Sequence, residues 1–175
     1  MTLFNDSEVF QKERPTKPTD AQLDKFYYDS AKEIVNQGYS DSDLEDIVED
    51  LKDLKPFNDS GFEMGKKLDR RSHASYDLST MFLEHLEGLE WDYRQVNENN
   101  VKTWVKAHNI QPQFPKGTKL IVKESLHWKS KTGEELYITG GNPELAVYYV
   151  NANPNENGGT VLPYELVEAR CSIQE

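Results

Sequence analysis

The residues best suited to acid–base or metal chemistry are Asp69, His73 and Asp77, two carboxylates and an imidazole at four-residue spacing. On a helix this spacing places all three on one face, where they could ligate a divalent cation or act as general acid and base. Serines on both sides of His73 favour a loop instead, and neighbouring arginines compete for the carboxylates. The sequence therefore predicts a helix cap with surface ion pairs, and a metal or catalytic site is the alternative.

Other reactive groups match no pattern that would support catalysis. Gly140-Gly141 precedes Asn-Pro rather than a helix, so it does not form a phosphate-binding loop. The single cysteine, Cys171, excludes paired-cysteine zinc sites and an internal disulfide. We therefore expect no enzyme activity, no cofactor and no catalytic metal, with an enzyme that uses an unrecognised Asp/His site as the remaining alternative.

A row of carboxylates along a predicted helix over 40–54 is the strongest indication of function. Aspartates recur there at steps of three and four residues, so they form a ridge beside the apolar stripe of the helix. The ridge comprises Asp43, Asp46, Asp50 and Asp53, and Glu49 adds to its charge. Carboxylates in the first turn interact favourably with the helix dipole, whereas Asp50 and Asp53 near the end do not. We therefore assign the ridge, and these two residues in particular, to a partner.

The overall charge restricts what that partner can be. The chain of 175 residues carries 31 acidic and 20 basic residues, a net charge of −11, and the excess of acids is concentrated in residues 1–60. Binding to nucleic acids or anionic membranes requires Lys and Arg to displace counterions, so both are disfavoured. The prediction is a protein partner with a basic surface, and simple solubility is the alternative reading of the charge.

Aromatic residues in the C-terminal third supply further candidate contacts. Tyr148 and Tyr149 are adjacent on a predicted strand, so they point to opposite faces and only one belongs to the core. The other, together with Trp128, is a candidate exposed anchor, because Tyr and Trp contribute much of the energy of protein interfaces. Ordinary packing of the small C-terminal domain is the alternative.

The elements that must position these residues are helical in the first two thirds of the chain. Residues 1–18 lack apolar periodicity after Phe10 and predict a flexible arm. An acidic helical domain of about four helices is expected over 19–110. Its expected elements are a helix from a Thr19–Gln22 capping box to Gly38, the helix 40–54, a short helix capped by Ser60 and weakened by Gly65, a helix from Asp77 to about Gly88, and a last helix capped by Asn97 or Asn99.

After Pro115 the apolar period changes from helical to alternating, which predicts a β domain over 115–170 and an extended junction at 109–116. The expected strands are Gly117–Glu124, Glu134–Thr139, Leu145–Asn151 and Thr160–Ala169, the last divided in two by Pro163. Short strands at this spacing usually close into a small antiparallel barrel, so the fold class is α+β, a helical bundle followed by a barrel.

Residues 115–169 resemble an SH3-like small barrel. The resemblance lies in the Lys116-Gly117-Thr118 opening, the long loop with Trp128, and the closing Gly159-Thr-Val-Leu-Pro-Tyr-Glu-Leu-Val167, which is similar to the Gly-x-x-Pro-x-x-x-Val ending of SH3 domains. The Ala-Leu-Tyr-Asp-Tyr opening of eukaryotic SH3 domains is absent, and Leu166 occupies the place of their groove tyrosine. The resemblance therefore implies a barrel without proline-motif binding.

These observations favour a non-enzymatic protein-binding or regulatory module that uses the acidic helical face, the barrel, or both. The alternative is an acidic inhibitor that imitates nucleic acid and occupies the basic cleft of a DNA- or RNA-handling enzyme. No apolar run approaches the length of a membrane span, and the first residues lack the basic and apolar regions of a signal peptide. We expect a cytoplasmic protein that does not bind membranes.

Overall fold

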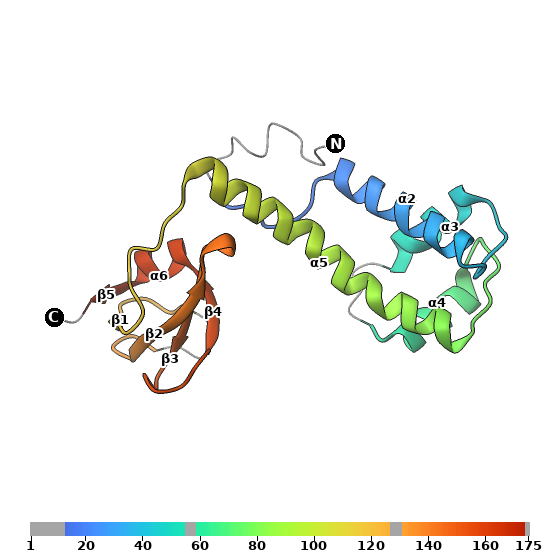
Figure 1. Cartoon of the computed structure of the whole chain (residues 1–175). Coiled ribbons are helices and arrows are strands. Elements are labelled where there is room, and N and C mark those ends of the chain that lie inside the picture. The colour runs from blue at the N-terminus through green and yellow to red at the C-terminus, as the bar shows by residue number, and fades with distance from the viewer. Residues whose placement is uncertain (1–12, 55–58, 127–130, 174–175) are drawn as a thin grey trace. The chain divides into compact units, whose positions relative to one another are not determined.

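The computed structural model describes residues 13–54, 59–126 and 131–173, which form an α+β fold of five α-helices and a five-stranded antiparallel sheet (Figure 1). Contacts divide the chain into two compact units. One includes Pro15–Asn100 and is called the helical unit here; the other includes Arg14 and Val101 onward and is called the β unit. The division falls inside a helix, α5 (Thr80–His108), earlier than the expected junction at 109–116.

The first two helices of the helical unit begin at different kinds of signal. Helix α2 (Asp20–Asn36) has the predicted capping box, in which Thr19 accepts from the backbone of Gln22 and Gln22 accepts from the backbone of Thr19 at 2.9 Å. Helix α3 (Leu44–Leu54) begins later than the expected residue 40. Ser40 is not its cap, because the Ser40 hydroxyl is buried and donates to the Ser75 carbonyl at 2.6 Å.

Helix α4 (Gly61–Arg71) is capped by Ser60 as predicted, and its glycines have a packing role. A Cβ atom at Gly61 would lie 1.9 Å from the carbonyl oxygen of Leu83, and one at Gly65 would lie 2.4 Å from the Leu83 side chain. Two glycines four residues apart therefore let α4 approach α5 closely. From the sequence, Gly65 was expected only to weaken the helix, and its close contact with α5 was not predicted.

Helix α5 is continuous over 29 residues, so the prediction of two helices separated near Gly88 is wrong. Gly88 costs about 1 kcal/mol inside a helix, and apolar packing on both sides of it offsets that cost. The first part of α5 enters the core of the helical unit through Phe82, Leu86 and Leu89. Its last part enters the core of the β unit through Val101, Trp104 and Val105. Asn97 and Asn99 lie within the helix and cap nothing.

Among the described residues, no helix is both long and apolar enough to span a bilayer.

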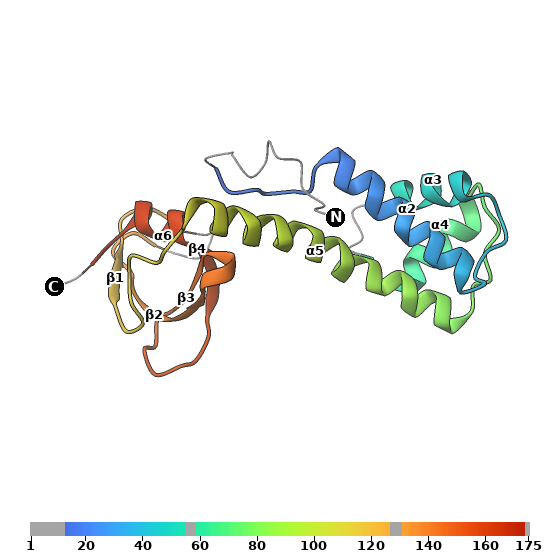
Figure 2. The ribbon, with the colours of Figure 1, turned by 45° about the horizontal axis from the view of Figure 1, so that its top comes forward.

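The core of the helical unit is built from all four of its helices, which lie side by side in Figures 1 and 2. Ala31 and Ile34 of α2 and Ile47 and Leu51 of α3 belong to this core, and all four side chains are fully buried. The apolar stripe predicted for 40–54 is therefore confirmed as the core-facing side of α3. The opposite side of α3 carries its charged residues other than Asp50, which is buried.

The β unit contains an open antiparallel sheet in the order β4-β3-β2-β1-β5. The strands are β1 (Lys119–Val122), β2 (Glu135–Asn142), β3 (Val147–Asn151), β4 (Thr160–Pro163) and β5 (Cys171–Ile173). Strands β4 and β5 are the two edges, so the sheet is not closed into a barrel. A 3₁₀ turn, η1 (Pro143–Leu145), connects β2 to β3 and ends at Ala146, which has a positive φ of 47°.

The last predicted strand is wrong over its second half, which forms helix α6 (Tyr164–Arg170). Pro163 ends β4 and directly precedes the helix, a position that proline tolerates because no helical N–H is lost there. Tyr164, Val167 and Cys171 are buried at steps of three and four, which is a helical period. Helix α6 contacts β3, β4 and β5 and lies beside the sheet in Figure 2.

Gly61, at the α4–α5 contact, and Gly88, outside it, give a matched pair of stability variants. Gly61→Ala should lower the free energy of unfolding by about 2–3 kcal/mol, because its new methyl group meets backbone rather than a movable side chain. Gly88→Ala should raise it by about 0.5–1 kcal/mol, since nothing lies within 4 Å of a Cβ there. Chemical denaturation measures both. Equal effects of the two substitutions would contradict the close approach of α4 and α5.

Candidate functional site

The predicted carboxylate ridge of α3 is divided between surface and interior. Asp43, Glu49 and Asp53 are exposed and Asp46 is half-buried, but Asp50 is only 2 % exposed. The carboxylates that share the outer side of α3 at steps of three and four are therefore Asp46, Glu49 and Asp53. We call the exposed and half-exposed carboxylates of this region the α3 acidic surface: Asp43, Glu45, Asp46, Glu49 and Asp53.

Asp50 holds the loop between α4 and α5. Its carboxylate accepts hydrogen bonds from the backbone N–H groups of His73 at 2.7 Å and Ala74 at 3.0 Å, and from the Tyr76 hydroxyl at 2.8 Å. These three donors compensate for the loss of water around a buried charge. Burial, and then the hydrogen bond to Asp50, raise the pKa of Tyr76 far above its ordinary value. The assignment of Asp50 to a partner is therefore corrected, because this residue is engaged inside the helical unit.

The α3 acidic surface lacks counterions within the described part of the chain. Among the side chains that the structure describes, which do not include that of Arg71, no Lys or Arg nitrogen lies within 4.0 Å of its carboxylates. Lys52, on the same helix, lies 3.5 Å from Asp24 of α2 instead. The carboxylates of the α3 acidic surface are exposed or half-exposed, so cationic groups in solution can reach them.

The alternative Asp69/His73/Asp77 site is not assembled on one helix. Helix α4 ends at Arg71, so Asp69 lies on the helix, whereas His73 and Asp77 lie in the loop that follows. The His73 backbone N–H is used by Asp50. In the described residues, no group of three or more His, Cys, Asp and Glu side chains is arranged to hold a metal ion.

A cavity of about 600 Å³ lies next to α3, between its C-terminal end and α4, and has mixed charge. Four of the charged groups that line it are paired with each other: Lys67 lies 2.5 Å from Asp59, and Lys66 lies 2.9 Å from Glu63. Such paired charges do not select a ligand of either sign. This cavity therefore adds little to the candidate site.

The two adjacent tyrosines of β3 differ in burial. Tyr148 is 2 % exposed and Tyr149 is half-buried, so Tyr148 is the core member of the pair. The Tyr148 hydroxyl accepts from the backbone N–H of Phe114 at 2.9 Å and donates to Glu168 at 2.9 Å. Burial is the largest cause that raises the pKa of Tyr148 to about 12. Tyr149 remains the candidate anchor, and Trp128 lies outside the described residues.

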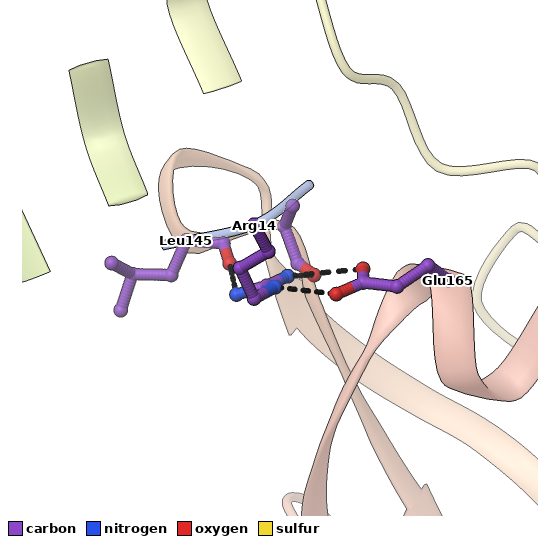
Figure 3. A network of polar contacts seen from close by, with 4 residues as sticks. Arg14, Leu145 and Glu165 are labelled. Carbon is purple, nitrogen blue, oxygen red and sulfur yellow. Dashed lines mark hydrogen bonds and ion pairs between the residues drawn. The ribbon is translucent and has the colours of Figure 1, made fainter. Parts of the chain in front are cut away.

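Arg14 is the site residue that sequence reasoning missed. The predicted flexible arm includes it, but its guanidinium is bound on the β unit (Figure 3). Nε lies 2.6 Å from Glu165 of α6, and Nη1 and Nη2 donate to the carbonyls of Leu145 at 2.9 Å and Ala146 at 2.6 Å. The Trp104 ring lies beneath it, 5.6 Å from Cζ. No local pattern signals this contact, because its hydrogen-bond partners are 131 to 151 residues away in the sequence.

Comparison with models of known protein families, with curated proteins and with solved structures finds no match to this chain. The candidate sites are therefore defined by their own geometry. The α3 acidic surface can bind cationic groups, and the recess around Arg14 is already occupied by one.

Asp50 and Asp53 give a matched test of which carboxylate is structural. Asp50→Asn should lower the free energy of unfolding by about 3 kcal/mol, because an amide presents one acceptor to three donors and places its own NH₂ against them. Asp53→Asn, on the exposed side of the same helix, should change it by less than about 0.5 kcal/mol. Urea denaturation distinguishes the two, and similar values would remove Asp50 from its structural role.

The raised pKa of Tyr148 predicts a loss of stability in alkali. Below pH 10 the hydroxyl is protonated in both states, but above it the unfolded chain ionises first, so the free energy of unfolding falls between pH 10 and about 12. Tyr148→Phe should reduce this slope. It should also cost about 1–3 kcal/mol at neutral pH, because the Phe114 N–H loses its acceptor. Other groups with a raised pKa, Tyr27, Tyr76, Tyr164 and Cys171, keep their contribution in the variant. A slope that does not change at all would contradict the assignment to Tyr148.

Proposed function

We propose that this protein is a non-enzymatic protein-binding module whose helical unit docks a basic surface of its partner on the α3 acidic surface. The observation that supports this is the set of carboxylates on the outer side of α3 with no recorded counterion among the described residues. Solubility requires net charge, but it does not require that the charge be concentrated on one helix, where like charges repel each other. A row of like charges is therefore the feature that needs a partner.

Interactions within α3 distinguish carboxylates that stabilise the helix from carboxylates that repel each other. Asp43, Glu45 and Asp46 lie at the start of the helix, where they interact favourably with its dipole. Glu49 and Asp53 lie beyond the first turn, four residues apart, where like charges repel by a few tenths of a kcal/mol. Asp50 is explained by the loop that it holds. Glu49 and Asp53 are thus the positions at which a Lys or Arg of the partner would gain most, by replacing repulsion with attraction.

The β unit supplies the second part of the proposal. We infer an SH3-like arrangement that is left partly open, and the strand order supports it, because the last strand, β5, returns to pair with β1. Short edge strands such as β5 and a helix beside the sheet limit unwanted pairing with other chains. In this arrangement the half-buried Tyr149 remains a candidate contact of the β unit.

The function is tested by neutralising the α3 acidic surface in the full chain and comparing it with an equal charge change elsewhere. The test variant carries Glu45→Gln, Asp46→Asn, Glu49→Gln and Asp53→Asn. The control variant carries Asp20→Asn, Glu84→Gln, Glu87→Gln and Asp92→Asn, all at exposed positions. Thermal melting of both variants first establishes that they fold.

Partners captured from the native host by the wild-type chain are identified by mass spectrometry, purified, and titrated against all three proteins. We expect the dissociation constant to rise by at least about tenfold in the test variant and by far less in the control, with a strong dependence on salt in the wild type. Equal affinities would eliminate the α3 acidic surface as a docking site. If the captured partner is a nucleic-acid enzyme that the chain inhibits, and if duplex DNA displaces the chain from it, the protein is an acidic mimic of nucleic acid instead.

A further inference from the structure

The recess that holds Arg14 has every element of a site for an arginine side chain. The Glu165 carboxylate receives the guanidinium at 2.6 Å and 3.3 Å, and the Leu145 and Ala146 carbonyls accept one N–H group each, from Nη1 and Nη2. The Trp104 ring provides a flat surface for a cation. Planar bidentate pairing of this kind suits arginine and not lysine, whose ammonium is a point charge. The Arg14 side chain is consequently only 15 % exposed.

The β unit holds this recess in place through contacts that do not involve Arg14. Ala146 is fully buried at the end of η1, and its carbonyl also accepts the backbone N–H of Tyr164 at 2.9 Å. That bond joins the carbonyl directly to the first turn of α6, where Glu165 lies. Trp104 is 5 % exposed within the core of the β unit. The site is therefore preorganised and does not require Arg14 to assemble it.

The recess continues into a larger groove. A cavity of about 710 Å³ is lined by Arg14, Trp104, Ile110, Gln113, Glu165 and Glu168, among others. Glu165 and Glu168 are three residues apart on α6 and both line it, so a second carboxylate lies about one helical turn from the first. Glu168 already accepts from Tyr148 and Gln113, which fixes its position. The groove thus offers volume and negative charge to residues that flank an arginine.

We propose that the β unit is a receptor for an arginine-containing peptide segment of a partner protein, and that Arg14 occupies its arginine site in cis. The seated guanidinium shows the ligand chemistry directly. A peptide in trans must displace Arg14, which is tethered and therefore present at a high effective concentration. This proposal does not depend on the α3 acidic surface.

The test uses full-length chains and a synthetic peptide with the sequence of residues 9–18, blocked at both ends. Calorimetric titration compares the wild type, Arg14→Ala, and Arg14→Ala combined with Glu165→Gln. We expect Arg14→Ala to bind the peptide at least about tenfold more tightly than the wild type, because its site is vacant. Replacing the peptide's arginine with lysine, or adding Glu165→Gln to the protein, should weaken binding by about tenfold or more.

Folding is checked separately, because Arg14→Ala could destabilise the β unit. Arg14→Lys retains the charge and should also admit the peptide, and its indole N–H signals in NMR should shift on titration. Failure of both folded variants to bind the peptide would overturn the proposal, as would equal binding of the arginine and lysine peptides. Concentration-dependent self-association of the wild type that Arg14→Ala abolishes would assign the site to a second copy of the chain, and would likewise overturn a separate partner peptide.

Discussion

The helical unit depends on one buried carboxylate. Asp50 is placed on the inner side of α3 beside Leu51, and it gathers the two backbone N–H groups and the hydroxyl that fix the loop between α4 and α5. Without that acceptor, the loop would bury unsatisfied donors at a cost of about 1–3 kcal/mol each. The position of the loop in turn sets the start of α5, against which the glycines of α4 pack. Asp50, whose spacing in the sequence is that of a surface charge, is thus a buried residue that holds the loop between α4 and α5.

The β unit uses the opposite charge in the same way. Arg14 reaches its acceptors from a segment far away in the sequence, and a carboxylate, two carbonyls and an indole ring receive it. Both centres compensate a charge that has lost water with several directed partners, as buried ions require. They differ in the origin of the charged residue. Asp50 belongs to a helix of its own core, whereas Arg14 comes from a segment that local sequence patterns predict to be an unstructured arm.

Local patterns predicted the parts of this fold that local physics determines. The capping box at Thr19, the cap at Ser60 and the apolar stripe of α3 each need only neighbours within one or two turns, and the structure confirms them. The break near Gly88 and the strand after Pro163 were wrong because tertiary packing decides both: apolar residues beyond Gly88 extend α5, and Tyr164 and Val167 bury one face of α6. The roles of Asp50 and Arg14 follow from hydrogen bonds to residues far away in the sequence. Residue spacing therefore could not predict the interior position of Asp50 or the anchoring of Arg14.

The two proposed sites have one feature in common: each uses carboxylates other than those that hold the fold together. Asp50 and Glu168 are acidic residues already committed to internal donors, whereas Glu49 and Asp53 have no recorded counterion among the described residues, and Glu165 has an arginine. Once the committed carboxylates are set aside, the two proposed sites use acidic groups on α3 and on α6, which belong to separate units. Each set suits a different form of the same chemistry: a row of exposed carboxylates tolerates Lys or Arg on a broad surface, whereas a walled recess with a flat ring and paired acceptors selects arginine. In the two proposals, α3 therefore attracts a basic surface without geometric specificity, whereas the recess beside α6 selects a single arginine side chain.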